Sequence, residues 1–316
     1  MRVLARIISG SRLHLGFYNI NYGGIKYGGV GLYIQNPRVV LEAREGDGLL
    51  IGFPEEIVAQ ANKIIESVCT SRRNFSLVVR ESPPIHTGLG VSTQILLSTA
   101  KLASALCDRN LSFKELVKIT GRGRYSGIGI HAFRVGGFVV DGGITISEDY
   151  PPLIFRVDFP SDWKIALVIP KGLRGLRDNE ESVVLDVLPS RVSEEKSREL
   201  ISIAFAMIIR GVSTRDFDSF VYGVELLQRK VGELFSVYQG GIFSTRETGL
   251  AVDILRKAGF KGTGQSSWGP VAYGFALTSS FDEKIKKLEN IIEKENLDFD
   301  LIATTARNKG ALLRRY

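Results

Sequence analysis

The stretch Pro83-Pro-Ile-His-Thr-Gly-Leu-Gly-Val-Ser-Thr-Gln94 follows an alternating segment and runs into one that is rich in leucine and alanine. These patterns predict a strand before it and a helix after it. Gly88 and Gly90 let the backbone approach a ligand closely, and the start of a helix favours an anion. We therefore predict a phosphate loop, with Ser92 and Thr93 donating to phosphate or binding Mg²⁺. The alternative is that Ser92 only caps the helix.

A second glycine-rich stretch reads Gly121-Arg-Gly-Arg-Tyr-Ser-Gly-Ile-Gly-Ile-His-Ala-Phe133. Two arginines stand among four glycines. The guanidinium group is a rigid fork of donors that suits phosphate oxygens. Alone, the stretch is also compatible with a basic turn. Beside the first loop, it makes Arg122 and Arg124 candidate phosphate ligands.

A third such stretch, Gly262-Thr-Gly-Gln-Ser-Ser-Trp-Gly-Pro-Val-Ala-Tyr-Gly-Phe275, lies in the second half of the chain. Glycine and serine are common in tight hairpin turns, which is the ordinary interpretation. This turn also combines hydrogen-bonding groups with an aromatic face. That combination favours a binding loop, and the residues that supply it are Gln265, Ser266, Ser267 and Trp268.

The N-terminal stretch Ser11-Arg-Leu-His-Leu-Gly-Phe-Tyr-Asn19 is followed by the glycine-rich segment Tyr22–Gly31. This pattern indicates a strand, a loop and a strand along a pocket. Arg12 and His14 alternate with leucines, so they share the face opposite them. A lone histidine is more often a packing residue than a catalyst. Its proximity to Arg12 and Tyr22 favours a functional role.

Composition limits the class of protein. A chain of 316 residues predicts about two domains, and 44% hydrophobic with 24% charged residues is typical of globular proteins. No apolar run reaches the ~18 residues that a membrane span needs, and the N-terminus reads as a strand rather than a signal peptide. The formal charge of +7 favours an anionic ligand, either a phosphorylated metabolite or nucleic acid, although a basic surface that only aids solubility is equally compatible.

The two cysteines, Cys69 and Cys107, have neither the spacing of a metal site nor the density of a secreted scaffold. A reduced cytoplasm is therefore the predicted compartment. Basic residues are spread along the chain without a block of five, which weakens the interpretation as a nucleic-acid-binding protein.

Strands alternate with helices in both halves, which predicts two α+β domains, residues 1–160 and 161–316, divided near Pro160-Ser-Asp-Trp163. Ser-x-x-Glu patterns at Ser112 and Ser244 predict capping boxes. The predicted strands are Val3–Ser9, Gly31–Ile34, Val39–Ala43, Leu49–Ile51, Phe75–Glu81, Gly136–Ile146, Leu153–Phe159, Lys164–Ile169 and Ile302–Arg307. The predicted helices are Pro54–Val68, Ser92–Cys107, one that starts at Ser112, Ser193–Arg210, Thr214–Phe235, Ser244–Ala258 and Ser280–Glu295.

The pattern Pro-x-x-x-Gly-Leu-Gly-x-Ser at 84–92, with a late Gly-x-Gly loop, resembles the GHMP kinase superfamily. That resemblance implies a two-domain α+β fold over most of the chain. A narrower likeness is to the β-ribofuranosylaminobenzene 5′-phosphate synthases, an archaeal family. It is carried by Arg12-Leu-His-Leu-Gly16, the Gly121–Phe133 stretch, Gly136-Gly-Phe-Val-Val-Asp-Gly-Gly143 and Gly264-Gln-Ser-Ser-Trp-Gly-Pro270.

The narrower resemblance implies a reaction of phosphoribosyl diphosphate with 4-aminobenzoate or its hydroxy analogue. CO₂ and pyrophosphate are released, and the product begins the synthesis of methanopterin-type cofactors. It also implies Mg²⁺, a homodimer and no use of ATP. GHMP kinases typically carry Pro-Ser-Gly-x-Asp where this chain has Ser126-Gly-Ile-Gly129, so their catalytic carboxylate is missing.

On this resemblance the glycine loop, Arg122 and Arg124 would hold phosphates. A second basic group would reach the phosphates across the cleft or be solvated instead, and it consists of Lys171, Arg174 and Arg177. Asp141, ahead of Glu180 and Glu181, would stabilise the sugar cation, unless it only ends a strand. Arg12 and His14 would orient the aryl carboxylate, with Tyr22 and Trp268 beside the ring. The rival interpretations are an ATP-dependent small-molecule kinase of the same superfamily and a non-enzymatic nucleic-acid-binding protein.

Overall fold

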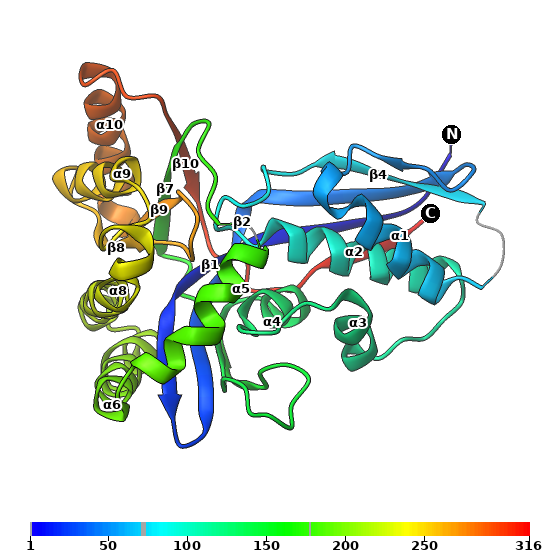
Figure 1. Ribbon diagram of the computed structural model, residues 1–316. Helices are drawn as coiled ribbons and strands as arrows, with labels where there is room; N and C mark the ends of the chain where they lie inside the picture. The colour runs from blue at the N-terminus through cyan, green and yellow to red at the C-terminus, as the bar shows by residue number, and fades with distance from the viewer. Residues whose placement is uncertain (1, 71–73, 177) are drawn as a thin grey trace.

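The computed structural model describes residues 2–70, 74–176 and 178–316 (Figure 1). Its first sheet is built on a long hairpin of β1 (Val3–Tyr22) and β2 (Ile25–Glu45), which turns at Gly23 and Gly24 with positive φ angles. Three short strands were predicted here, together with a strand, a loop and a strand over residues 11–31, instead of one continuous hairpin. Register shifts between Ser9 and Ser11 and between His14 and Gly16 interrupt the two-residue alternation, which is why the sequence pattern looks broken.

Further strands extend this sheet on both sides of the hairpin. Within the described ranges it has seven strands, with the path β11-β1-β2-β4-β3, while β5 pairs with β2 and β6 pairs with β5. The last strand of the chain returns to pair with β1, so both halves of the sequence contribute to this sheet. The added strands are β3 (Leu50–Ile51), β4 (Phe75–Glu81), β5 (Phe138–Asp141), β6 (Leu153–Val157) and β11 (Leu312–Arg315).

Four helices cover this sheet: α1 (Glu55–Val68), α2 (Val91–Leu106), α3 (Phe113–Thr120) and α4 (Ile128–Val135). Helix α2 packs against β1 and β2 and is buried on nearly all sides, which explains its leucine- and alanine-rich sequence. The capping box predicted at Ser112 is confirmed. Helix α4 was not predicted, because glycines within and before it disfavour a helix.

The two cysteines are not free. A disulfide joins Cys69 to Cys107, immediately after the C-terminal ends of α1 and α2. Spacing alone gave no sign of this pair, since the two cysteines are 38 positions apart and the segment between them includes β4 and the whole of α2. Because intracellular proteins of hyperthermophiles are also rich in disulfides, the bond assigns no compartment. No helix in the described part of the chain is long and apolar enough to cross a membrane.

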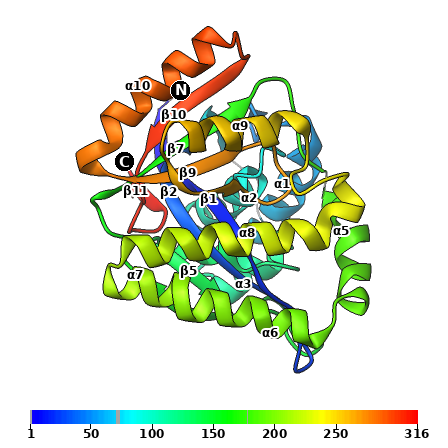
Figure 2. The ribbon, with the colours of Figure 1, turned by 90° about the vertical axis from the view of Figure 1, so that its left-hand side faces the viewer.

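The second sheet has the order β10-β7-β9-β8 and is covered by α9 and α10 (Figure 2). Helix α8 crosses from this sheet to the first, packing on both β8 and β1. The strands are β7 (Trp163–Pro170), β8 (Lys261–Gln265), β9 (Ala272–Leu277) and β10 (Phe299–Thr304). The three helices are α8 (Phe217–Gln239), α9 (Arg246–Lys257) and α10 (Thr278–Lys294).

Between β7 and α8 the chain forms a run of shorter helices. The single helix predicted over Ser193–Arg210 is divided, because the turn widens to a π-helix in its middle. Thr245, rather than Ser244, caps α9 by accepting from the Thr248 N–H. The run consists of α5 (Asp178–Val187), η1 (Leu188–Arg191), α6 (Glu194–Ile203), η2 (Ala204–Ile209) and α7 (Arg210–Thr214).

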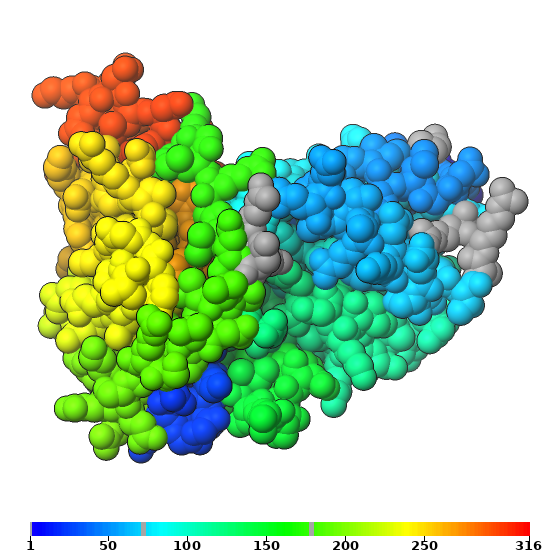
Figure 3. Space-filling model, in the orientation of Figure 1, coloured from blue at the N-terminus to red at the C-terminus, as the bar shows by residue number. Residues whose placement is uncertain are grey.

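In the space-filling view the green segment around α5 lies between a yellow-to-red lobe and a blue-to-cyan lobe (Figure 3). The largest apolar core is continuous across both, from the first-sheet helices to β7, β9 and α8. The division into residues 1–160 and 161–316 therefore stays a prediction. The strands and loops that carry the candidate residues meet at this junction.

Candidate active site

The glycine loop leads directly into α2. Gly88 and Gly90 have φ angles of 88° and 67°, a conformation that side chains rarely tolerate. A Cβ atom at Gly88 would also lie 2.1 Å from the carbonyl oxygen of Ser266, and one at Gly90 would lie 2.7 Å from Cγ of Arg12. Gly90 is itself the N-cap residue, and no side chain caps the helix. Ser92 therefore does not act as the cap.

Arg12 and Arg122 lie against this loop. Nη1 of Arg12 donates to the carbonyl of Gly88 at 2.6 Å, and Nε of Arg122 donates to the hydroxyl of Thr93 at 3.1 Å. Both side chains line the same two cavities as Thr93. The arrangement places two guanidinium groups beside the N-terminus of α2, where an anion is already favoured.

Arg124 has a different environment. Its Nη2 atom lies 3.3 Å from a carboxylate oxygen of Asp186 in α5, and the Tyr125 hydroxyl donates to the same carboxylate at 2.7 Å. The arginine side chain is 66% exposed. Arg124 lines the cavity wall, but its contact with Asp186 ties the Gly121–Ser126 loop to α5.

Three adjoining chambers surround these residues, and Ser267 lines all of them. The arginine chamber, about 1060 Å³ with its open mouth included, is lined by Arg12, His14, Phe17, Thr93, Gly121, Arg122, Gly123, Arg124, Tyr125, Ser126, Gly129, Ile130, Glu181, Ser182 and Ser267. The glycine-loop chamber is lined by Arg12, His86, Gly88, Gly90, Val91, Ser92, Thr93, Arg122, Leu176, Glu181, Ser267, Trp268 and Gly269.

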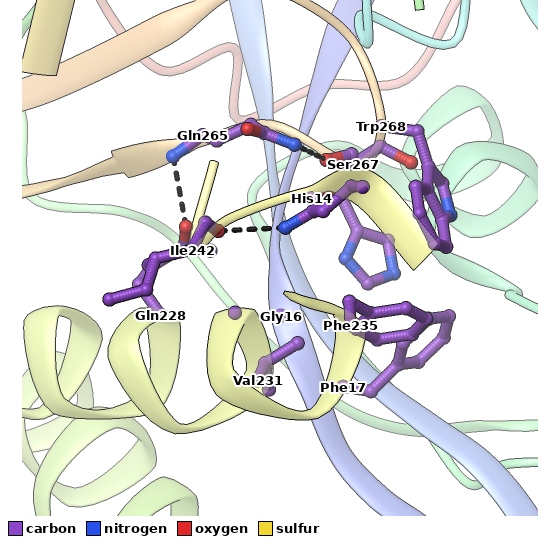
Figure 4. A pocket seen from close by; sticks show the side chains of 12 residues that line it. His14, Gly16, Phe17, Gln228, Val231, Phe235, Ile242, Gln265, Ser267 and Trp268 are labelled. Carbon is purple, nitrogen blue, oxygen red and sulfur yellow. Dashed lines mark hydrogen bonds between the residues drawn. The ribbon is translucent and has the colours of Figure 1, made fainter. Parts of the chain in front are cut away.

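The third, the apolar chamber, has aromatic walls on one side and glutamine amides on the other (Figure 4). The rings of Phe235 and Trp268 meet edge to face at 4.6 Å, and Phe17 contacts the His14 imidazole at 4.7 Å. The space is about 460 Å³ with its mouth included. Its lining residues are His14, Gly16, Phe17, Gln228, Val231, Gly232, Phe235, Gln239, Ile242, Gln265, Ser267 and Trp268.

His14 is an uncharged wall of this chamber. Its side chain is 4% exposed, and Nε2 has no hydrogen-bond partner among the described residues. Burial, with the nearby Arg12 guanidinium, lowers the pKa of His14 to about 3. The imidazole is therefore neutral near pH 7 and cannot form a charge pair with a carboxylate.

The third glycine-rich stretch is a hairpin whose turn faces the chambers. Its first residues lie in β8 and its last in β9, so the loop is limited to residues 266–271. The hydroxyl of Ser266 donates to the Gly88 carbonyl at 2.7 Å and accepts from the His14 backbone N–H at 3.0 Å. Ser267 adopts a positive φ of 56°. Ser266 thus links the glycine loop, β1 and the second sheet.

Asp141 is placed behind the chambers and not in them. Its carboxylate is fully buried and accepts from the backbone N–H groups of Gly29, Gly127 and Gly143 at 2.7–3.0 Å. Burial raises the pKa of Asp141 to about 7. It lines none of the three chambers that the described residues form. In this position the side chain pins the Ser126–Ile128 turn to β2 and cannot touch a bound sugar.

Three other candidates lie outside the chambers. Tyr22 is 38% exposed at the tip of the β1–β2 hairpin, with its ring 5.9 Å from the Arg198 guanidinium. Lys171 pairs with Asp298 at 3.0 Å. Arg174 pairs with Glu56 at 3.4 Å, next to the His86–Glu56 contact at the edge of the glycine-loop chamber. Arg177 lies outside the described residues.

Sequence reasoning missed several wall residues. Glu181, ranked behind Asp141, lines both the arginine and glycine-loop chambers. Phe17, Val231 and Phe235 were not singled out, since apolar residues in a strand or helix ordinarily indicate core packing. The Arg12–Gly16 motif was the one signal close to Phe17. Nothing near α8 in the sequence indicates that this helix faces a ligand chamber.

Comparisons with known proteins agree with this geometry. Residues 56–137 match the family model of the GHMP kinases N terminal domain. The β-ribofuranosylphenol 5′-phosphate synthase of Methanocaldococcus jannaschii is 30% identical, covering 95% of this chain and 97% of its own length. The protein of the same name from Archaeoglobus fulgidus is 31% identical, with 97% and 98% covered.

Solved structures share the fold. Mevalonate diphosphate decarboxylase from Staphylococcus aureus has a TM-score of 0.70 at 14% identity, covering 99% of this chain and 98% of its own. Mevalonate kinase from Methanococcus jannaschii has a TM-score of 0.68 at 15% identity, covering 96% and 98%. The predicted GHMP-kinase-like α+β fold is thus confirmed, and the near full-length relatives show that the chain belongs to the β-ribofuranosylphenol 5′-phosphate synthase family.

Proposed function

We propose that the chain joins phosphoribosyl diphosphate to 4-aminobenzoate or 4-hydroxybenzoate and releases CO₂ and pyrophosphate. The observation that carries this proposal is the junction of two unlike chambers, one with aromatic walls and one with paired arginines, at Ser267. An aryl ring suits the first and a phosphorylated sugar the second. The product would be the arylated ribose 5′-phosphate with which methanopterin-type cofactor synthesis begins.

Arg12, Arg122 and the N-terminus of α2 would bind the departing diphosphate. Backbone N–H groups and guanidinium groups stabilise charge that accumulates on the leaving group. Gly129 supports a transfer without a kinase base. A Cβ atom there would lie 3.3 Å from Cγ2 of Thr93, which places the position beside the arginine chamber. GHMP kinases typically carry a carboxylate at this position, whereas glycine has no side chain.

Mg²⁺ would fit at the start of α2. Ser92 and Thr93 line the glycine-loop chamber and carry hydroxyl oxygens, and magnesium prefers oxygen ligands combined with substrate phosphates. Ser92 and Thr93 would hold the ion, which would neutralise charge on the leaving diphosphate. Glu181 is assigned to the cationic sugar, because it lines the cleft whereas Asp141 is sealed from it.

The chemistry balances without an oxidant. The bond from ribose C1 to the diphosphate oxygen breaks, and the ring carbon that bears the carboxylate attacks C1. Electrons from the para nitrogen or oxygen support this attack. Loss of CO₂ then returns the pair of electrons to the ring. ATP has no part in this scheme, and a homodimer stays a prediction.

Carboxyl-labelled 4-aminobenzoate and 4-hydroxybenzoate, incubated with phosphoribosyl diphosphate and Mg²⁺, test the proposal. We expect labelled CO₂ and pyrophosphate in equal amounts, and only when both substrates are present. A parallel incubation with ATP and sugar or isoprenoid acceptors serves as the control. Acceptor-dependent formation of ADP, without CO₂ release in the first assay, would reject the synthase and favour a kinase.

A further inference from the structure

Among the described residues that line the apolar chamber, none has a charged side chain. Among the described residues that line it are three glutamines, one serine and the imidazole of His14, with aromatic and aliphatic groups as the remainder. The low pKa of His14, caused by its burial, keeps that imidazole neutral. A carboxylate placed deep in such a space would lose its hydration without gaining a cation.

The adjoining chamber has the opposite character. It contains Arg12, Arg122 and Glu181, and it meets the apolar chamber at His14, Phe17 and Ser267. A molecule with an apolar ring and an anionic end is therefore compatible with only one orientation. Its ring fits inside, and its anionic end stays at the junction.

We infer that the aryl acid binds ring first, with its para substituent deep in the apolar chamber and its carboxylate against the hydroxyl of Ser267 at the mouth. This inference rests on the proposed function and specifies how the substrate lies. The carbon that bears the carboxylate then faces the arginine chamber, where C1 of the sugar would be. Ser267 is thereby a substrate-contacting, specificity-determining residue.

The backbone of Ser267 supports this assignment. A φ of 56° is uncommon for a residue with a side chain, and such conformations persist where the surrounding structure imposes them. Ser266 is fixed on one side by its contacts with Gly88 and His14. On the other side, Gly269 packs against Thr87 and Gly88 so closely that a Cβ atom there would lie 2.1 Å from their backbone. These contacts fix the backbone of Ser267 where the three chambers meet, so this residue lines all of them.

This orientation has a consequence for the loss of CO₂. A salt bridge to the carboxylate would stabilise the ground state and oppose decarboxylation. At the mouth the carboxylate meets the neutral Ser267 hydroxyl, while Arg12 and Arg122 line the adjoining chamber and are assigned to the diphosphate in the proposed function. The carboxylate thus has no salt bridge of its own, and this weak contact favours its departure as CO₂.

The first test compares Ser267→Ala with Ser267→Gly. Both remove the hydroxyl, but glycine also relieves the positive φ. We expect each to raise the KM for the aryl acid about tenfold, because one hydrogen bond to a charged group is lost. The KM for phosphoribosyl diphosphate should be unchanged. Inhibition by phenol or aniline, which lack the carboxylate, should be unaffected. Equal weakening of the aryl acid and of these rings, or no change in either, would overturn the role of Ser267.

The second test concerns the depth of the ring. Val231→Phe fills the apolar chamber, whereas Val237→Phe on the same helix changes a side chain that is 76% exposed. We expect the first to abolish inhibition by phenol and aniline and the second to leave it intact. If wild type releases CO₂ yet Val231→Phe binds both rings normally, the orientation is wrong and the proposed function stands. If wild type releases none, the proposed function itself fails.

Discussion

At the scale of single residues, Arg122 and Arg124 show how context separates two similar side chains. Sequence reasoning assigned both to phosphate. Arg122 donates to Thr93 at the start of α2, while Arg124 pairs with Asp186 in solvent. An exposed pair of this kind contributes little to stability or binding.

We expect Arg122→Ala to raise the KM for phosphoribosyl diphosphate by a factor of about 10 to 100, because a charge-assisted contact with a phosphate is lost. Arg124→Ala is the matched control and should change that KM less than about threefold. Initial rates at saturating aryl acid measure both effects. A larger loss in Arg124→Ala than in Arg122→Ala would reverse the assignment.

His14 makes stability depend on pH. In the unfolded chain a histidine binds a proton near pH 6.5, but the buried imidazole does so only near pH 3. Between these values the unfolded state holds more protons, so the free energy of unfolding falls as the pH drops. Asp141 shifts in the opposite sense, since its pKa is raised to about 7, and it partly offsets the change.

Comparison with His14→Gln isolates the histidine, because Asp141 is present in both proteins. Between pH 7 and about pH 4, we expect the free energy of unfolding of wild type to fall by about 3 kcal/mol more than that of the variant, because of the shifted pKa of His14. Urea unfolding at each pH measures the difference. Parallel pH profiles for the two proteins would show that the imidazole is already protonated or solvated in the folded state.

At the scale of elements, α1 and α2 are parallel helices joined at their C-terminal ends by the disulfide. Their N-terminal ends lie at the site: Glu56 in the first turn of α1 contacts His86 and Arg174, and α2 begins at the glycine loop. The bond therefore constrains the two helices that border the glycine loop.

Reduction of this bond should lower the free energy of unfolding. A cross-link between residues 38 positions apart is worth about 4 kcal/mol in loop-closure entropy. Chemical unfolding with and without reductant measures the change. In the variant Cys69→Ala/Cys107→Ala, reductant should have no effect. A wild-type protein that unfolds at the same denaturant concentration in both conditions would contradict this role.

Elements with one clear signal were predictable from sequence. Helix α3 has its capping box, and α2 has a long apolar stretch after a glycine loop. Helix α4 was missed, since its helical conformation depends on tertiary packing against β2 and β5 and not on its glycine-containing sequence. The long β1–β2 hairpin was seen only in fragments, because bulges shift which face each side chain occupies.

At the scale of the whole molecule, the sequence singled out the residues that meet at the glycine loop, such as Arg12 and Arg122, but not those of the apolar chamber. Glycines and arginines mark the glycine-loop side in the local sequence. The apolar chamber is assembled from β1, α8 and the β8–β9 turn, and its first and last lining residues are more than 200 positions apart. Phe235 becomes a chamber wall only because α8 packs on both sheets. No local pattern encodes that contact.

The two halves meet through glycines that leave no room for a side chain, and Gly269 tests this contact. A Cβ atom at Gly269 would lie 2.1 Å from the backbone of Thr87 and Gly88, so Gly269→Ala must push the β8–β9 turn away from the glycine loop. We expect a loss of more than about 2 kcal/mol in stability, together with loss of pyrophosphate and phenol binding.

Gly249→Ala is the control, since its Cβ atom would meet nothing closer than 3.5 Å. Gly249 lies in helix α9, where alanine favours the helix by about 0.5–1 kcal/mol. Thermal unfolding and equilibrium binding measure both variants. Normal pyrophosphate binding by Gly269→Ala would show that the glycine loop keeps its shape when the β8–β9 turn is pushed away, and that this contact does not support the site.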